Sequence, residues 1–274
     1  MFGKELAYTR SNPITKLVYR LLGDLNMGGR SRGWYLLDEM KGLDLNYMRI
    51  LDAGAGYGPY AFHLARKFPK AEIIAVEIDE EKVRICQEIA EKERIGNVRF
   101  IRMDLREMPF ENEFEIAICS DVLEHIPDDK GAAERIFAAL KPGGLLFLHA
   151  PGLYSRKPVW ERGIIGKIHK RWFLWHTRGK PKYYFDARAG YTDEEILSLL
   201  RSVGFRILKV RPTYGRIGLA AFSLFKIARI FLPIYPLLLP LIAFMCYWEV
   251  IRPPRKGVSR VIIASKLFPS FFEH

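Results

Sequence analysis

The sequence predicts an α/β fold: a doubly wound, mostly parallel seven-stranded sheet with an antiparallel last strand and two insertions. Short apolar runs alternate with amphipathic helical patterns along most of the chain, and the first apolar run ends in a glycine-rich turn. Strands that alternate with helices form parallel sheets covered by helices on both faces. The 274 residues, 49% of them hydrophobic, are enough for one sizeable core.

The predicted elements follow in order after an N-terminal helical region at 13–41. Strands are expected where apolar residues run together between turn signals, at 48–53, 72–78, 98–102, 115–119, 145–149, 205–211 and 259–266. Helices are expected where apolar residues recur every three or four positions, at 59–68, 79–94, 130–140 and 192–203. The last helix starts with a capping box of Thr192 and Glu195 and ends at Gly204.

These elements divide the chain into five parts. They are an N-terminal helical cap (1–47), the first part of the core (48–151), a basic aromatic insertion (152–190), the C-terminal part of the core (191–215 and 258–268) and an apolar insertion (216–257).

Positive charge is concentrated in the first insertion. The formal net charge is +12, and residues 152–188 supply +8 of it, from ten Lys and Arg against two acidic residues. Aromatic side chains such as Trp160, Trp172 and Trp175 lie between the basic ones. Interleaved basic and aromatic residues suit single-stranded nucleic acid, a membrane interface or a solvated basic lid over a site. The sequence leaves these three interpretations open.

The cysteines and the N-terminus indicate a reducing compartment. Cys86, Cys119 and Cys246 lie far apart without metal-ligand spacing, so we expect small core residues. Lys4 and Arg10 stand near the N-terminus with no apolar run before a cleavage site, so no secretory signal is expected. The protein is therefore predicted to be cytoplasmic.

The most informative motif is the turn after the first strand, Leu51-Asp52-Ala53-Gly54-Ala55-Gly56-Tyr57-Gly58. Glycine allows a bulky ligand to lie against the main chain, where a Cβ would clash. A dinucleotide fingerprint has the spacing GxGxxG around a pyrophosphate. Here the spacing is GxGxG, with Pro59 at the third position, and an acidic residue beside the glycines suits a cationic amino-acid group better. A dinucleotide is therefore not expected.

This turn resembles motif I of the class I S-adenosylmethionine (SAM)-dependent methyltransferases, of the type 11 or quinone-biosynthesis-like kind. Three further segments in the family's order strengthen the resemblance: 75–79, 102–110 and 119–127, with Leu140-Lys141-Pro142-Gly143-Gly144 after them. The resemblance implies a Rossmann-like SAM-binding core at 48–151, methyltransferase activity, and SAM as the cofactor.

The resemblance also assigns the cofactor contacts. Glu77, at the end of the second strand, would bind the ribose hydroxyls with its two carboxylate oxygens. Asp104 would accept a hydrogen bond from the adenine amino group, with Met103 and Leu105 against the ring. The implied set is Asp52, Gly54, Ala55, Gly56, Tyr57, Glu77, Ile78, Met103, Asp104, Leu105 and Ser120.

Two histidines are the candidate catalytic residues. Methyl transfer is an in-line displacement that needs a nucleophile about 3 Å from the methyl group, and a hydroxyl acceptor must also lose a proton. His149 ends the predicted fifth strand, and the carboxyl ends of the strands face the ligand crevice. It is equally possible that the ring of His149 only forms hydrogen bonds with neighbouring backbone. The resemblance places His125 near the site.

A metal is not predicted. In some quinone O-methyltransferases, acidic residues and a histidine in the loop after the fourth strand hold a divalent metal. Asp121, Glu124 and His125 are similar in type. A polar loop that caps a helix is the simpler interpretation.

The second insertion is predicted to contact a membrane. Residues 230–248 carry no charge and include three prolines, which are expected to break a straight helix. The flanking strands should pair antiparallel in one sheet, which excludes a single crossing, and the insertion is shorter than the roughly 40 residues that two crossings require. We expect a shallow helical hairpin within 217–250, peripheral on the cytoplasmic membrane face. An apolar subdomain or a homodimer interface is the alternative.

These observations predict a methyltransferase for a lipophilic small molecule, such as an isoprenoid quinone precursor or a polyprenyl-linked intermediate. The basic insertion motivates an RNA methyltransferase as the first alternative, but the loop after the fourth strand lacks an Asn/Asp-Pro-Pro-Tyr signature, so nucleic acid is less favoured. The second alternative is a membrane-associated scaffold that has kept the fold without catalysis.

Overall fold

The computed structural model describes residues 7–8, 13, 16–17, 20, 27–153, 187–188, 190–228 and 235–267. Most of the predicted helical region before residue 27 and of the basic insertion lies outside the described residues. From 27 to 153 the description is continuous and includes the turn, loop and strand ends singled out above.

Seven strands form one sheet in the order β3-β2-β1-β4-β5-β7-β6. β1 to β5 pair in parallel, and β7 is antiparallel to both of its neighbours, β5 and β6. The predicted mostly parallel sheet with an antiparallel last strand is confirmed. The strands are β1 (Arg49–Ala53), β2 (Glu72–Glu77), β3 (Val98–Arg102), β4 (Phe114–Ser120), β5 (Leu140–Pro151), β6 (Phe205–Thr213) and β7 (Ser259–Lys266).

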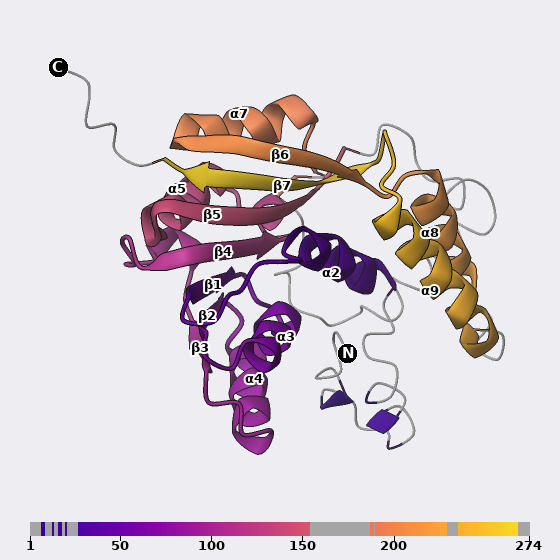
Figure 1. Cartoon of the computed structure of the whole chain (residues 1–274), viewed down its shortest axis with the longest axis horizontal. Coiled ribbons are helices and arrows are strands. Elements are labelled where there is room, and N and C mark those ends of the chain that lie inside the picture. Colours follow the sequence, from indigo (N-terminus) through magenta and orange to yellow (C-terminus); the bar gives the residue numbers. More distant parts are fainter. Residues whose placement is uncertain are drawn as a thin grey trace.

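Helices cover both faces of this sheet (Figure 1). One hydrophobic cluster joins the sheet to α2 (Met27–Glu39), α3 (Pro59–Lys67) and α4 (Glu80–Lys92). A second cluster joins the opposite face to α5 (Asp129–Ala139) and α7 (Asp193–Val203). Two short 3-10 helices, η2 (Leu105–Glu107) and η3 (Leu123–His125), follow β3 and β4.

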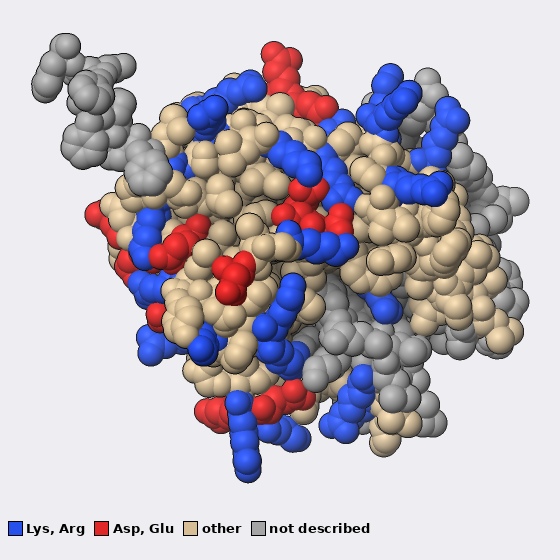
Figure 2. All heavy atoms as spheres, viewed as in Figure 1, with Lys and Arg blue, Asp and Glu red and all other residues tan. Residues whose placement is uncertain are grey.

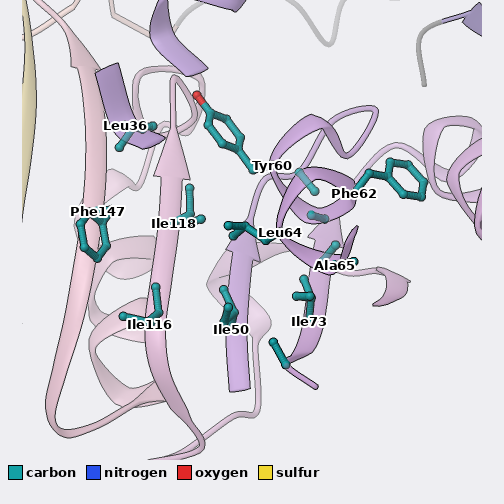
Figure 3. Close-up of a cluster of buried hydrophobic side chains, with 14 of the residues drawn as sticks. Leu36, Ile50, Tyr60, Phe62, Leu64, Ala65, Ile73, Ile116, Ile118 and Phe147 are labelled. Atoms are coloured by element: carbon teal, nitrogen blue, oxygen red, sulfur yellow. The ribbon is translucent and has the colours of Figure 1, made fainter. Parts of the chain in front are cut away.

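The period of two in the strands divides their side chains between these clusters. Ile50 of β1 pairs with Ile73 of β2 and Ile116 of β4, and all three point toward Leu64 of α3 (Figure 3). The next residue of β1, Leu51, lies in the cluster on the other face. The sheet is therefore buried on both sides, as near-continuous apolar strands require.

Strand β5 starts earlier than the sequence predicts. Leu140 already pairs with Phe114 of β4, so the predicted turn at 141–144 lies inside the strand. The register shifts between Phe114 and Ile116, and Gly143 adopts φ +80°. Glycine and proline are typical of turns, but they also occur where a strand is irregular. The sequence therefore predicted a turn where the start of β5 lies.

The apolar insertion folds as two packed helices, α8 (Arg216–Ala228) and α9 (Tyr235–Ile251). Pro240 lies inside α9, so the expectation that the prolines break the helix is wrong at this position. One proline near the start of a helix removes a single main-chain hydrogen bond, which side-chain packing against α8 offsets. Within the described residues, no helix combines the length and apolarity needed to cross a membrane.

Candidate active site

The predicted site residues gather at the carboxyl ends of neighbouring parallel strands. β1, β2 and β4 end at Ala53, Glu77 and Ser120, and the register places these ends side by side. β5 carries His149 next to Ser120. Ligands of open α/β sheets bind outside the carboxyl ends of the strands, at this kind of edge.

The turn after β1 needs its three glycines for different reasons. Gly54, Gly56 and Gly58 have φ values of +78°, +58° and +69°, which L side chains rarely adopt. A Cβ on Gly54 would lie 2.5 Å from the Val122 side chain, and one on Gly58 would lie 2.6 Å from the Phe100 ring. Among the described residues, nothing lies within 4 Å of a Cβ built on Gly56. Gly56 is therefore the point where the turn offers bare main chain to a ligand.

Asp52 lies beneath this turn. Its side chain is buried and accepts a hydrogen bond from the main-chain N–H of Ala61, in the first turn of α3, at 3.1 Å. Burial raises the pKa of Asp52 to about 7, and the negative charge of Glu77 adds to the shift. Asp52 thus connects β1 to α3 and keeps an acidic group behind the glycines.

Replacing Asp52 by Asn is expected to change how the free energy of unfolding depends on pH. Because the folded pKa of about 7 exceeds the ordinary value of 3.8, the proton stabilises the folded state. That contribution is complete below about pH 4 and is lost as the pH rises to about 7. Urea denaturation should show Asp52→Asn gaining stability relative to wild type between those values. If the difference in free energy of unfolding between the two proteins stays constant with pH, the pKa of Asp52 is not raised in the folded state.

Glu77 holds the turn from the end of β2. Its Oε2 accepts from the N–H of Gly56 at 2.8 Å, and its Oε1 accepts from the N–H of Asp79 at 3.1 Å. Lys82 Nζ lies 3.6 Å from Oε1. Each carboxylate oxygen has a second acceptor position. Glu77 therefore fixes the bare main chain at Gly56 and retains capacity for the two hydroxyls of a ribose.

The segment after β3 borders Glu77. The N–H of Met103 donates to the carbonyl of Glu77 at 3.0 Å, and Ile78 is 55% exposed beside it. Asp104 caps η2 and forms an ion pair with Arg106 at 2.6 Å, which lowers the pKa of Asp104. Leu105 is buried. The structure brings these predicted contacts together, with the carboxylate of Asp104 already engaged within its own segment.

A polar cluster lies at the ends of β4 and β5. Asp121 Oδ1 lies 2.5 Å from His149 Nδ1, and Asp121 Oδ2 lies 2.5 Å from Arg32 of α2. His149 Nε2 lies 3.5 Å from the hydroxyl of Thr213. Burial alone would raise the pKa of Asp121, but Arg32 and His149 outweigh it and lower the pKa to about 2. We name this set of four residues the Asp121 cluster.

The two predicted catalytic histidines differ in accessibility. The side chain of His149 is only 1% exposed, so both ring nitrogens face protein. The side chain of His125, in η3, is 39% exposed and lies 3.9 Å from Glu124. Among the residues that the structure describes, no group of three His, Cys, Asp or Glu side chains is arranged to hold a metal ion.

Sequence reasoning missed Arg32 and Thr213. Arg32 belongs to a helix that the sequence marks only as part of a cap, and Thr213 follows the predicted end of its strand. A third missed contact joins Tyr60 of α3 to Ser120, with 3.1 Å between the hydroxyl oxygens. No spacing in the sequence connects these residues with Asp121 or Ser120.

Comparison with known families decides the class of this site. A family model described as a methyltransferase domain matches residues 45–189, which is more than half of the chain. The chain belongs to this methyltransferase family. It is a class I SAM-dependent methyltransferase, and SAM is its cofactor.

Relatives of this methyltransferase include quinone-biosynthesis enzymes. It is 25% identical over 209 residues to a ubiquinone/menaquinone biosynthesis C-methyltransferase, UbiE, from Dinoroseobacter shibae, covering 72% of this chain and 82% of the relative. It is 27% identical over 113 residues to a ubiquinone biosynthesis O-methyltransferase from Acinetobacter baylyi, covering 40% of this chain and 46% of that relative. The chain thus spans less than half of the second relative.

A solved structure shares the fold of this methyltransferase. The phosphoethanolamine N-methyltransferase 2 of Haemonchus contortus, in complex with SAM, matches with a TM-score of 0.61 and 19% identity. The match covers 98% of this chain and 60% of that one. At this identity the likeness supports the Rossmann-like fold alone.

The geometry fits the cofactor. A Cβ at Gly56 would enter open space, Glu77 has acceptor capacity beside it, and Ile78 presents an exposed apolar side chain on the same edge. Bare main chain, a carboxylate with free acceptor positions and an apolar side chain would suit the amino-acid moiety, the ribose and the adenine of SAM, respectively. SAM, when bound, supplies an electrophilic methyl group on its sulfonium.

Proposed function

We propose that this methyltransferase acts on a lipophilic small molecule at a membrane surface, with isoprenoid quinone precursors and polyprenyl-linked intermediates as the substrate class. The observation that carries the proposal is the outer face of α9. An enzyme whose acceptor is dissolved in a bilayer must meet that acceptor at the bilayer surface, and α9 has the composition for this contact.

Helix α9 is apolar on its outer face as well as on its packed face. Its inner side chains, such as Ile242 and Cys246, pack with α8. Its outer side chains lie three or four positions apart and stay exposed, with Leu237 at 78%, Leu241 at 50% and Phe244 at 58%. A helix that is apolar all round suits a buried or membrane-contacting place. A contiguous exposed apolar patch marks an interaction site.

Basic residues surround the end of this hairpin that adjoins the sheet. Arg216 starts α8, and Arg252, Arg255 and Lys256 follow the end of α9, all of them exposed. Figure 2 shows Lys and Arg at this end and an uncharged surface over the rest of α9. The Arg252 guanidinium also stacks on the Trp248 ring, 4.2 Å from its centroid. Cations and an aromatic ring beside an apolar surface suit the headgroup level of an anionic membrane.

The relatives support the same substrate class, because they are named as methyltransferases of ubiquinone and menaquinone biosynthesis. For a hydroxyl-bearing acceptor, we propose His125 as the proton acceptor, since its side chain is accessible. His149 is enclosed, and we propose that it acts behind Asp121 rather than on the acceptor.

Vesicle co-sedimentation tests the membrane contact. The full chain is expected to pellet with vesicles of phosphatidylcholine and phosphatidylglycerol, and less with phosphatidylcholine alone. Leu241→Glu combined with Phe244→Glu should lower the bound fraction at least about tenfold, because two charges would enter the interface. Leu208→Glu is the matched control, since Leu208 is also 50% exposed but lies on the edge strand β6.

The result also separates the alternatives. Equal pelleting of all three proteins, or none by wild type, rules out the lipid contact. If Leu241→Glu with Phe244→Glu instead turns a dimer into a monomer in size-exclusion chromatography, the face is a protein interface. In a turnover assay, a prenylated hydroquinone in vesicles is expected to be methylated faster than the same hydroquinone without its prenyl chain; equal rates would contradict the substrate class.

A further inference from the structure

Helix α2 contributes one side chain, that of Arg32, to the Asp121 cluster. Arg32 reaches across from α2 and contacts Asp121, while the other carboxylate oxygen of Asp121 contacts His149. The side chain of Arg32 is 34% exposed and that of Asp121 17%, whereas His149 is enclosed. Arg32 therefore lies at the solvent end of a chain of contacts that leads inward to the histidine.

Asp121 is held in an unusual backbone conformation. Its φ of +52° lies in the left-handed region, which is uncommon for residues other than glycine and persists where surrounding contacts determine it. Three contacts do so here: the two at its carboxylate, and its own N–H, which donates to the carbonyl of His149 at 3.1 Å. Removing Arg32 would take away the one that comes from outside the sheet.

The same residue fixes the loop against the cofactor turn. Val122 follows Asp121, and its side chain rests where a Cβ of Gly54 would lie. The conformation of Asp121 thus sets the position of Val122, and Val122 packs on the glycine turn. The contact between Arg32 and Asp121 is thereby linked to the glycine turn through Asp121 and Val122.

The charge of Asp121 fixes the histidine as well. With its pKa lowered to about 2, Asp121 is a carboxylate at neutral pH and only accepts hydrogen bonds. In the neutral ring, Nδ1 therefore carries the proton, and Nε2 accepts from the hydroxyl of Thr213.

We propose that Arg32 is a positioning residue of the methyl-transfer site, which holds Asp121 in its left-handed conformation and keeps the proton of the neutral His149 ring on Nδ1. Arg32 acts through Asp121 and does not act on the methyl group. The link to turnover rests on the proposed role of His149, but the geometry is tested without any acceptor.

Neighbouring side chains of α2 dock the helix that carries Arg32. Tyr35, one turn further along α2, donates to the buried carboxylate of Glu249 in α9, and Trp34 packs edge-on against Tyr247 at 5.9 Å. The apolar hairpin thus supports α2, the helix from which Arg32 contacts Asp121.

Long-range ¹H–¹⁵N NMR of the histidine rings in the full-length protein tests the proposal. Wild type should show His149, assigned from its loss in His149→Gln, with its proton on Nδ1. In Arg32→Gln the ratio of the Nε2–H to the Nδ1–H form should rise about fivefold, because the carboxylate that Arg32 held in place can turn away from Nδ1. An effect of this size is at the upper end for one partly exposed ion pair. Arg32→Lys should restore most of the wild-type ratio. Arg84→Gln, which removes a surface arginine paired only within α4 in the residues described, should not change it.

A double-mutant comparison shows whether Arg32 acts through Asp121. Asp121→Asn should move the proton to Nε2, because an amide can donate to Nδ1. Adding Arg32→Gln to it should then have no further effect. A wild-type tautomer in Arg32→Gln, or an equal effect of that change in both backgrounds, overturns the proposal. If Arg32→Gln yields no folded protein, Asp121→Asn decides, and an unchanged Nδ1–H form contradicts the proposal. Loss of vesicle binding affects none of these readings.

Discussion

Replacing Glu249 by Ala is expected to destabilise the protein by about 3–5 kcal/mol, because each buried donor that loses its acceptor costs about 1–3 kcal/mol. Glu249 is 2% exposed and accepts from the N–H of Gly215 at 3.0 Å, from the N–H of Gly218 at 2.6 Å, and from the hydroxyl of Tyr35. Gly215 directly precedes α8 and Gly218 lies in its first turn, where main-chain N–H groups have no intrahelical partner. Alanine would leave three buried donors without their acceptor.

Urea denaturation measures this effect. Glu134→Ala is the control, because Glu134 is exposed on α5 with only a 3.6 Å surface contact to Lys130 and should change stability by less than about 0.5 kcal/mol. Similar midpoints for Glu249→Ala and wild type would mean that the hairpin is not anchored through this carboxylate.

Replacing Glu77 by Ala should weaken SAM binding about 10- to 100-fold, which corresponds to about 1.5–3 kcal/mol for hydrogen bonds to a charged group. The change removes the acceptor expected for the ribose and also leaves the N–H groups of Gly56 and Asp79 without this acceptor. The loss of SAM affinity in Glu77→Ala should therefore exceed the loss in Glu77→Gln, which keeps one side-chain oxygen.

Glu72→Ala provides the matched control for this measurement. Glu72 lies on the same strand at its opposite end, where it is exposed and pairs with Arg49 at 2.9 Å. Calorimetric titration with SAM should give wild-type affinity for Glu72→Ala. An unchanged affinity in Glu77→Ala would place the cofactor away from the end of β2.

The sequence predicted the sheet and its ends well because these features are local. A strand that ends in glycines and a strand that ends in Glu77 are visible as short patterns, and parallel pairing brings their ends together. The Glu77 hydrogen bond to Gly56 follows from that pairing. The antiparallel pairing of β7 with β6 was also predicted, as the pairing of the two strands that flank the apolar insertion.

The rest could not be predicted, because it depends on contacts between distant segments. Arg32 meets Asp121, and Tyr35 meets Glu249, only after α2 docks on the folded core. The ion pair of Asp104 with Arg106, by contrast, is a local contact two residues away, and no pattern in the sequence marks it. Pro240 continues α9 because packing offsets one lost hydrogen bond.

Calorimetry of the intact protein with S-adenosylhomocysteine, beside Gly56→Ala, tests the central claim that SAM lies on the turn after β1. A Cβ at Gly56 meets no atom of the described residues within 4 Å, and the left-handed φ of +58° costs an alanine only about 1–2 kcal/mol. The variant should therefore fold with reduced stability and yet bind at least about tenfold more weakly, since the added methyl group would occupy the ligand's place. Equal affinity of the two folded proteins, or binding of NADH in competition with S-adenosylhomocysteine, would contradict the account.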